Sequence, residues 1–332
     1  MPVEPAKDCE ASTARAGLKV CVLMGGVGGE RQVSLESGRC VAEALRRAGV
    51  DVFAADVDPE RLDVLGRCDV DVFFVALHGQ FGEDGVLQQI LEDRSLVYTG
   101  SGPQASRLAF DKWAAKQLFA QAGIPTPPAV RYDPGENAGE LREKLLPLGG
   151  RYVVKPLRQG STIGVSIEET PQAAAEAARR CYERFGECMI ERYVPGREVT
   201  VGILLGRALP IIEIRSAGGF YDYHAKYVDE RTRFLFDTIE DKVLAGRIQQ
   251  AGLDCFNVLG CRHLGRVDFI LGDDGRYYVL ELNTIPGMTE HSLLPKAAAK
   301  AGISMSRLCV SVVESAVAGK SGRCCAAAGG SK

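Results

Sequence analysis

Two carboxylates late in the chain have a spacing that could hold a metal ion. Residues 265–283 read GRVDFILGDDGRYYVLELN, which predicts two strands joined by a type I′ turn at the Asp-Gly dipeptide. If the hairpin is symmetric about that dipeptide, Asp268 faces Glu281. Arg266 then faces Asn283 on the same side. Facing carboxylates repel, so a covered face would need a compensating cation, whereas an exposed face would simply meet water.

The opposite face of the hairpin is predicted to be apolar and to pack in the core. The side chains on this face are Val267, Phe269, Leu271, Tyr278, Leu280 and Leu282. A loop of three residues instead of two would change this pairing, so the metal interpretation depends on the rest of the chain.

A glycine-rich segment near the start, GGVGGE, follows the apolar run Leu18–Met24 and precedes a helical pattern. This strand–loop–helix order invites a dinucleotide-binding interpretation. The G-x-G-x-x-G spacing fails, however, because Arg31 stands where the third glycine belongs. A nicotinamide-dependent oxidoreductase is therefore disfavoured. Glu30 in this loop could meet a ligand ammonium group or only the dipole of the following helix.

Three further segments contain groups that suit anions or ligands. RQGSTIG, which follows Lys155 between two strand patterns, offers hydroxyls and backbone N–H groups to phosphate oxygens, although an ordinary hairpin connection would look the same. NTIPGM directly follows the hairpin, and its N–H groups could hold an oxyanion. His78 ends a strand pattern, a position that favours ligand contact. Lys112 lies in a helix predicted over residues 105–122, where it could equally be solvated.

Length and composition narrow the class of protein. The 332 residues suggest two or three domains, and the net charge of −3 without a basic stripe argues against a nucleic-acid partner. The chain contains neither a run of about 20 apolar residues nor a secretory signal, so a cytoplasmic protein without a membrane partner is expected. Its eleven cysteines include no C-x-x-C pair, which argues against a zinc site.

In combination, the motifs resemble the D-alanine–D-alanine ligase family of the ATP-grasp superfamily, from Lys19 to about Ala318. The resemblance rests on seven segments: GGERQVSLESG, ALHGQFGEDG, YTGSGPQAS, VVKPLRQGSTIG, GFYDYHAKY, GRVDFIL and LELNTIPGMTEHSLLP. It implies a mixed α/β and α+β fold, in which an N-terminal parallel α/β domain precedes the two-domain ATP-grasp fold that clamps ATP between its sheets.

The resemblance also implies a domain organisation. After a disordered leader at 1–17, residues 18–105 would bind the first substrate and residues 106–195 would form the central subdomain with the phosphate lid. Residues 196–318 would form the C-terminal subdomain with the metal and second-substrate sites, and residues 319–332 a flexible tail.

The same resemblance assigns the candidate ligands of ATP and metal. Two Mg²⁺ or Mn²⁺ ions would bind Asp268, Glu281 and Asn283. Phosphate oxygens would contact Lys112, Lys155, Lys226 and the lid residue Ser161. The rest of the nucleotide, including adenine and ribose, would contact Glu191, Tyr193, Val194 and Glu198.

For the amino-acid substrates, the resemblance places Glu30 and His78 at the ammonium of the first D-alanine, and Ser292 and Leu293 at the carboxylate of the second. The catalytic set would include Glu30 with Ser161 and Tyr227, which would reach it to close two loops over the site. Arg266 and the Gly287 N–H would stabilise charge on the oxygen of the reacting carbon.

The implied reaction has two steps. The first D-alanine carboxylate attacks the γ-phosphate to give an acyl phosphate, and the amine of the second D-alanine then displaces phosphate. A homodimer is implied as well. D-lactate or D-serine as the second substrate remains an alternative, although Tyr227 favours dipeptide formation. A catalytically silent ATP-grasp protein that only binds nucleotide is a rival from another class.

Overall fold

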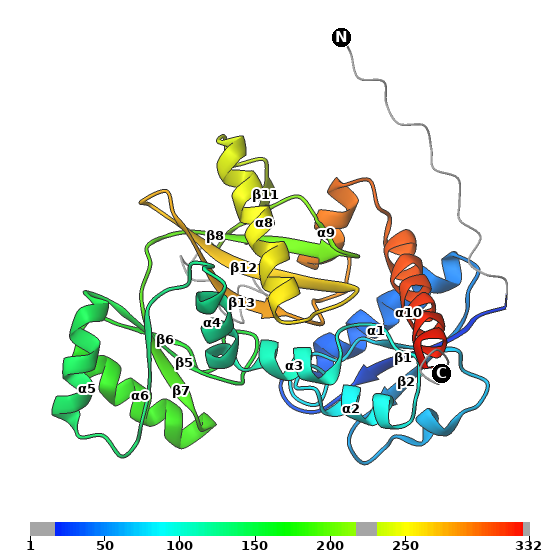
Figure 1. The fold of residues 1–332 in the computed structure, drawn as a ribbon, viewed down its shortest axis with the longest axis horizontal. Helices are drawn as coiled ribbons and strands as arrows, with labels where there is room; N and C mark the ends of the chain where they lie inside the picture. The colour runs from blue at the N-terminus through cyan, green and yellow to red at the C-terminus, as the bar shows by residue number, and fades with distance from the viewer. Residues whose placement is uncertain (1–16, 217–230, 328–332) are drawn as a thin grey trace, which may run out of the picture.

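The computed structural model describes residues 17–216 and 231–327. Within these residues the chain forms three sheets, each built from one contiguous stretch of sequence (Figure 1). Lys226 and Tyr227, two of the predicted site residues, lie outside the described residues.

The first sheet is parallel, with strand order β2-β1-β3. Its strands are β1 (Lys19–Gly25), β2 (Asp51–Val57) and β3 (Val72–Val75). Residues 20–23, VCVL, are fully buried, because helices cover both faces of a parallel sheet. Helix α1 (Arg31–Arg47) packs on one face and α2 (Val86–Asp93) on the other, with a short 3₁₀ turn η1 at Asp63–Gly66, and α3 (Pro103–Phe110) follows α2 in the chain. The predicted parallel α/β unit at the start of the chain is confirmed.

The second sheet is antiparallel, with order β4-β7-β5-β6. Its elements are β4 (Ala129–Arg131), α5 (Ala138–Leu145), η2 (Leu146–Leu148), β5 (Tyr152–Pro156), β6 (Ser166–Glu168), α6 (Pro171–Phe185) and β7 (Cys188–Arg192). Asn137 and Thr170 accept backbone N–H bonds at the starts of α5 and α6, which fixes where these helices begin. The RQGSTIG loop connects β5 to β6.

The third sheet has order β11-β10-β8-β12-β13, with β9 paired to β8. Its strands are β8 (Gly196–Leu204), β9 (Arg207–Ala208), β10 (Ile212–Arg215), β11 (Arg233–Phe236), β12 (Leu264–Gly272) and β13 (Tyr277–Asn283). Helix α8 (Lys242–Val258) packs on one face through a core that includes Val201, Ile248 and Phe269. Helix α9 (Leu293–Lys300) follows the hairpin.

The single helix predicted over residues 105–122 was wrong, because the structure has two helices there. The chain leaves helical geometry at Asp111, which has φ −85° and ψ 98° and whose side chain accepts the N–H groups of Trp113 and Ala114. An aspartate in this role begins a new helix. Helix α4 (Lys112–Gln121) therefore starts at Lys112, and the break sets the direction of that lysine.

The β12–β13 hairpin has the predicted pairing but not the predicted turn. Asp268 pairs with Glu281, as expected, and Arg266 pairs with Asn283. The two-residue type I′ turn was wrong: the loop has three residues, 273–275, closed by the Gly272 N–H donating to the Arg276 carbonyl at 2.8 Å. Within it the Asp274 carboxylate accepts the Arg276 N–H at 3.0 Å, which favours the longer loop.

A β-bulge between Asp268 and Phe269 offsets the extra loop residue and restores the register at the carboxylates. On the turn side of the bulge, Val279 is fully buried in place of the predicted Tyr278 and Leu280. The prediction that those two residues belong to the apolar core face was therefore wrong. Leu280 instead lines the cavity between the second and third sheets.

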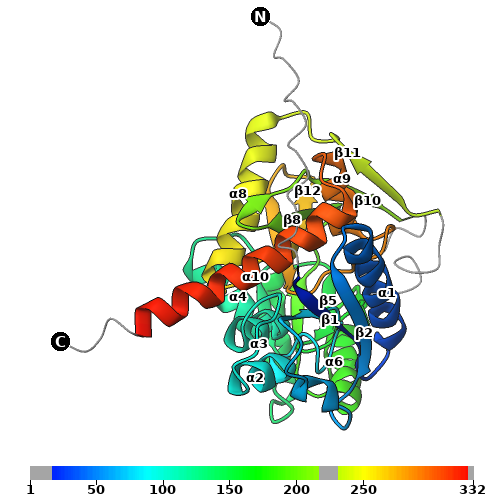
Figure 2. The ribbon, with the colours of Figure 1, turned by 90° about the vertical axis from the view of Figure 1, so that its right-hand side faces the viewer.

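The last helix, α10 (Met305–Ala327), returns to the first sheet and packs against α1 and β3. Leu308 and Val312 of α10 share a core with Val20 and Val41, and Figure 2 shows the helix running past α1. Among the described residues, no single helix has the length and apolarity to cross a bilayer. The consecutive helices around residues 293–319 reach that threshold only as a pair, and they are bent by 102°.

Candidate active site

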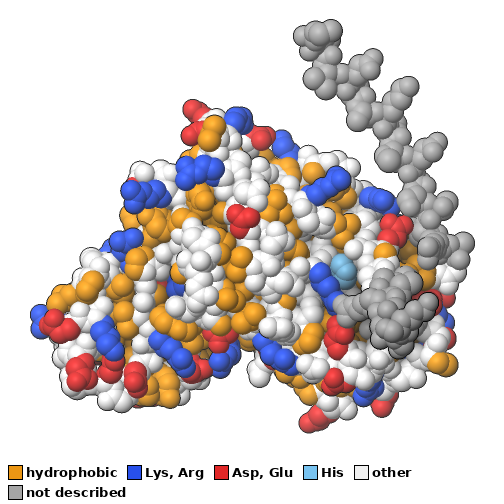
Figure 3. Space-filling model, viewed as in Figure 1, with side chains coloured by type: hydrophobic (Ala, Val, Ile, Leu, Met, Phe, Trp, Pro, Cys, Tyr) orange, Lys and Arg blue, Asp and Glu red, His pale blue; other side chains and the backbone are white. Residues whose placement is uncertain are grey.

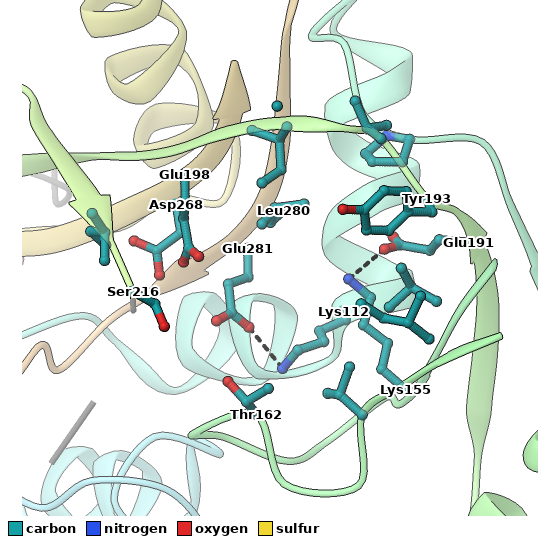
Figure 4. A pocket seen from close by; sticks show the side chains of 18 of the residues that line it. Lys112, Lys155, Thr162, Glu191, Tyr193, Glu198, Ser216, Asp268, Leu280 and Glu281 are labelled. Atoms are coloured by element: carbon teal, nitrogen blue, oxygen red, sulfur yellow. Dashed lines mark ion pairs between the residues drawn. The ribbon is translucent and has the colours of Figure 1, made fainter. Parts of the chain in front are cut away.

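A cavity of about 520 Å³ lies between the second and third sheets. One wall comes from β5, β6 and β7, and the other from β8, β10 and the β12–β13 hairpin. Its lining mixes apolar side chains such as Ile270 and Leu280 with lysines and carboxylates. Figure 4 shows Lys112 paired with Glu281 and Lys155 paired with Glu191, with Asp268 and Glu198 further along the cavity. An elongated ligand with an apolar portion and an anionic portion suits this lining.

Asp268 is a buried carboxylate that is fully engaged by its neighbours. Its side chain is bound by both arms of Arg266, at 2.8 Å from Nε to Oδ1 and 2.7 Å from Nη2 to Oδ2. The Thr200 hydroxyl donates to Oδ1 at 2.6 Å and the Asn283 amide donates to Oδ2 at 3.1 Å. The repulsion expected between the facing carboxylates is thus offset on this side by a guanidinium.

Glu281, the partner of Asp268 across the hairpin, pairs with a lysine from a different element. Its Oε2 lies 2.9 Å from Lys112 Nζ, which also donates to the Gln159 carbonyl at 2.7 Å. Gln159 belongs to the RQGSTIG loop, so Lys112 connects the hairpin to that loop. A polyanionic ligand would compete with Glu281 for this ammonium group.

The predicted metal ligands provide oxygen donors, which Mg²⁺ and Mn²⁺ prefer. No cluster of three or more His, Cys, Asp or Glu side chains has metal-holding geometry within the described part of the chain. Two facing carboxylates and an amide fit an ion that takes its remaining ligands from phosphate oxygens and water, which is how Mg²⁺ is usually held beside nucleotides. Glu198 also projects into this part of the cavity (Figure 4).

Glu191 is a buried carboxylate between two lysines. Its Oε2 lies 2.5 Å from Lys155 Nζ and its Oε1 lies 2.7 Å from Lys116 Nζ. Burial alone would raise the pKa of Glu191, but the two ammonium groups outweigh burial and hold that pKa below its usual range. Next along the chain, Tyr193 and Val194 line the cavity, and the Arg151 guanidinium lies 4.3 Å from the Tyr193 ring centroid.

Glu30 lies at the start of α1 and contacts the RQGSTIG loop. The Ser161 hydroxyl donates to its Oε1 at 2.5 Å, a contact that the resemblance implied. Ser161 has a left-handed backbone with φ +52°. A Cβ added at Gly160 would lie 2.6 Å from Glu30 Oε2, and one at Gly79 would lie 2.2 Å from it. Glycine at both positions therefore lets the backbone close around this carboxylate.

His78 is buried, and protein atoms bind both of its ring nitrogens. Nδ1 lies 2.8 Å from the Ile285 carbonyl and Nε2 lies 2.8 Å from the Ser37 hydroxyl. Burial lowers the pKa of His78 below its usual value. Ser37 also accepts the Met288 N–H at 3.2 Å. The ring therefore joins α1 to the NTIPGM segment, and a ligand contact through it would first require one of these bonds to break.

The NTIPGM segment leads into α9 and brings Gly287 beside Ser292. A Cβ added at Gly287 would lie 2.7 Å from Ser292 Oγ. Ser292 precedes the first residue of α9, Leu293, which is buried. Unpaired N–H groups at a helix start suit a carboxylate, which is consistent with the substrate group predicted there.

Four buried polar residues of this region were missed by the sequence analysis. They are Glu83, Lys116, Thr200 and Glu213. Glu83 lies within ALHGQFGEDG and Lys116 lies four residues after Lys112, but spacing alone does not separate either one from an ordinary solvated charge. Their positions became evident only from the packing of distant segments around them.

Glu83 couples the first sheet to the NTIPGM segment. Its Oε2 accepts the Gly79 N–H at 2.8 Å and its Oε1 accepts the Ile285 N–H at 3.2 Å. Burial, together with the nearby Glu30 carboxylate, raises the pKa of Glu83 to about 8. Between the ordinary value of 4.5 and about 8, the folded state therefore holds a proton that the unfolded chain has lost.

We expect this group to make the free energy of unfolding fall as the pH rises from 4.5 towards about 8, because stability decreases where the folded state binds more protons. Urea denaturation at a series of pH values measures the slope. Glu83→Gln should remove this part of the slope, whereas Glu60→Gln, at an exposed carboxylate, should leave it. Identical slopes in wild type and Glu83→Gln would contradict the assignment.

The fold and the site together define a class of protein. Two antiparallel sheets that enclose a cavity lined by lysines and carboxylates, preceded by a parallel α/β unit, are the architecture of ATP-grasp enzymes.

Comparisons with known proteins specify the family. Residues 118–314 match the family described as D-ala D-ala ligase C-terminus. The D-alanine–D-alanine ligase of Syntrophotalea carbinolica is 43% identical over 304 residues, covering 91% of this chain and 96% of that protein. The enzyme of the same name from Methylacidiphilum infernorum is 40% identical over 295 residues, covering 89% and 94%. The chain belongs to the D-alanine–D-alanine ligase family.

Solved structures agree with this assignment. The crystal structure of the D-alanine–D-alanine ligase from Bacillus anthracis complexed with ATP superposes with a TM-score of 0.81 at 34% identity, covering 92% of this chain and 99% of that one. The VanG D-Ala:D-Ser ligase from Enterococcus faecalis superposes with a TM-score of 0.78 at 26% identity, covering 90% and 99%.

Proposed function

We propose that this protein uses ATP to join two D-alanine molecules into D-alanyl-D-alanine through a D-alanyl phosphate. Family membership supports the reaction. The structural observation that supports these site residues is that Lys112, Lys155, Asp268 and Glu281 all line one cavity. Lysines and metal-binding carboxylates together are what a nucleoside triphosphate requires.

In the proposed binding mode, the ammonium groups of Lys112 and Lys155 leave their carboxylate partners and bind phosphate oxygens. Lys226 would add a third ammonium. Mg²⁺ or Mn²⁺, as two ions, would bind Asp268, Glu281 and Asn283, and would neutralise the charge that develops on the phosphates during transfer. The adenosine portion would contact Glu191, Tyr193, Val194 and Glu198.

The amino-acid substrates would bind between the first unit and the NTIPGM segment. The Glu30 carboxylate would hold the ammonium of the first D-alanine, beside His78, and the start of α9 at Ser292 and Leu293 would hold the carboxylate of the second. We assign Arg266 and the Gly287 N–H to the negative charge that develops on the reacting carbonyl oxygen. Because Arg266 is bound to Asp268 in this structure, its action on substrate requires a change in that pairing.

The lid has a physical purpose in this mechanism. An acyl phosphate is hydrolysed when water reaches it, so the loop over the site must close before it forms. The bond from Ser161 to Glu30 supports a closed lid that is fixed to the first-substrate carboxylate. Tyr227 would add the second bond of this closure. We further propose a cytoplasmic homodimer that supplies the dipeptide for peptidoglycan synthesis.

A phosphate-release assay tests the proposed function. Purified protein with ATP and Mg²⁺ should release phosphate with D-alanine alone, and D-alanyl-D-alanine should be the product by mass spectrometry. D-serine and D-lactate are tested as second substrates, because the E. faecalis neighbour is a D-Ala:D-Ser ligase. Release only with D-lactate or D-serine would replace the proposed product. Nucleotide binding without release under any condition would indicate the non-catalytic alternative.

A further inference from the structure

Lys116 is a buried lysine that no part of the proposed reaction uses. It lies on α4, one helical turn after Lys112, and is 6% exposed. Its ammonium group has three oxygen partners. It forms the ion pair with Glu191 Oε1, donates to the Pro127 carbonyl at 2.7 Å and donates to the Thr126 hydroxyl. The ammonium group is thus held by one charged partner and two neutral hydrogen-bond acceptors.

The other lysine on Glu191 is held differently. Lys155 lines the cavity, whereas Lys116 does not. Within the described residues, Lys155 Nζ has one charged partner, Glu191 Oε2, and no further hydrogen bond. Of the two, Lys155 is thus the ammonium that can turn towards a ligand in the cavity, while Lys116 is fixed behind the cavity wall.

The exchange of partners by Lys155 creates an electrostatic problem. When Lys155 moves to a phosphate oxygen, Glu191 loses one of its two counter-ions. Glu191 is 2% exposed, so water cannot take the place of that charge. A buried carboxylate without a counter-ion is strongly unfavourable. The free energy needed to leave Glu191 in that state would weaken the binding of the nucleotide.

We propose that Lys116 is a positioning residue whose fixed positive charge keeps Glu191 neutralised, so that Lys155 is released to bind ATP. This inference rests on the proposed function, because it assigns Lys155 to a phosphate. Lys116 also holds the carbonyl of Pro127, which itself lines the cavity, and thereby fixes the wall next to Glu191. Burial lowers the pKa of Lys116 and the charge of Glu191 opposes that effect, as expected for a buried ion pair.

Lys116→Met tests the inference in the full-length protein, with ATP affinity measured by isothermal titration calorimetry. We expect the dissociation constant for ATP to rise about tenfold or more, the range for losing a hydrogen-bonded charge partner. The KM for D-alanine should stay within about twofold, because Glu30 and its surroundings do not contact Lys116. Thr126→Val, which removes only the hydroxyl partner, should leave ATP affinity near the wild-type value.

The pH dependence separates this role from a purely structural one. In Lys116→Met, the pKa of Glu191 should be higher than in wild type, because one neighbouring positive charge is lost. Once Glu191 is protonated and neutral, it no longer needs Lys155 as a counter-ion, and Lys155 is free to bind ATP. The ratio of the variant to the wild-type dissociation constant should therefore shrink as the pH falls from 8 to 6. A weakened affinity with a pH-independent ratio would overturn the inference, as would an ATP affinity equal to that of wild type.

A second pair of variants covers the case in which Lys116→Met does not fold. If the charge of Glu191 is the main route by which Lys116 affects ATP, Glu191→Gln and the double variant Lys116→Met/Glu191→Gln should bind ATP with affinities within about twofold of each other. A double variant that binds much more weakly would contradict the inference. Wild-type turnover is measured alongside: an inactive wild type would contradict the proposed function, whereas an active wild type with an unaffected Lys116→Met contradicts only the role of Lys116.

Discussion

Glu281→Ala should reduce kcat by about 1,000-fold, because loss of a metal ligand removes several kcal/mol of transition-state stabilisation, and each 1.4 kcal/mol corresponds to about tenfold. Glu281 is half-buried at the edge of the cavity, and the substitution removes its ion pair with Lys112. The fold should therefore survive, with an unchanged circular dichroism spectrum. Steady-state phosphate release at saturating ATP and D-alanine measures the effect.

Asp273→Ala is the matched control for Glu281→Ala. Asp273 is an exposed carboxylate on the tip of the same hairpin, and its backbone N–H, not its side chain, bonds to the Pro195 carbonyl. Removing this side chain changes the charge of the protein equally but leaves the cavity intact, so kcat should not change. If Glu281→Ala retained wild-type kcat with Mg²⁺, the assignment of the hairpin carboxylates to metal would have to be abandoned.

Arg266→Ala should lower the free energy of unfolding by about 3–5 kcal/mol, the range for removing one partner of a buried ion pair. Asp268 is 5% exposed, and Arg266 binds both of its carboxylate oxygens. Without the guanidinium, the charge of Asp268 would depend on the neutral donors Thr200 and Asn283. Urea denaturation of the ligand-free protein measures the loss.

Two further variants define what Arg266 contributes. Arg276→Ala, on the same hairpin, removes an exposed guanidinium whose nitrogen lies 3.9 Å from Asp274, and it should change stability by less than about 0.5 kcal/mol. Arg266→Lys keeps a positive charge but not the two-armed contact, so it should fall between wild type and Arg266→Ala. Equal stabilities for Arg266→Ala and Arg276→Ala would show that Asp268 is not a buried charge that needs this partner.

The facing carboxylates Asp268 and Glu281 illustrate how a correct pairing can come from an incorrect turn. The sequence predicted that Asp268 faces Glu281 by assuming a two-residue turn and an unbroken ladder. The structure has a three-residue loop and a bulge, and the two shifts cancel at the carboxylates. On the turn side of the bulge they do not cancel, so Val279 is buried in the core and Leu280 lines the cavity. The alternation of side chains along a strand predicts which face of the sheet each one lies on only where the hydrogen-bond ladder has no bulge.

By itself, the sequence determined the parallel first unit, the two strands of the β12–β13 hairpin and the motifs on which the family resemblance rests. These features depend on local patterns: apolar runs, glycine-rich turns and motifs in a fixed order. The family followed from the combination of those motifs and agrees with the comparisons.

Only the tertiary structure decided which charges are paired. His78 is bonded to Ser37 and Ile285, and Glu83 is bonded to a segment about 200 residues away. Lys112 and Lys116 are four residues apart on one helix, yet one reaches a hairpin and the other a buried carboxylate. A charged side chain has the same local pattern whether it meets water or a buried partner. The partner of a buried charge comes from a different segment of the chain, so the sequence pattern does not reveal it. Desolvation then sets the free-energy cost of leaving that charge unpaired.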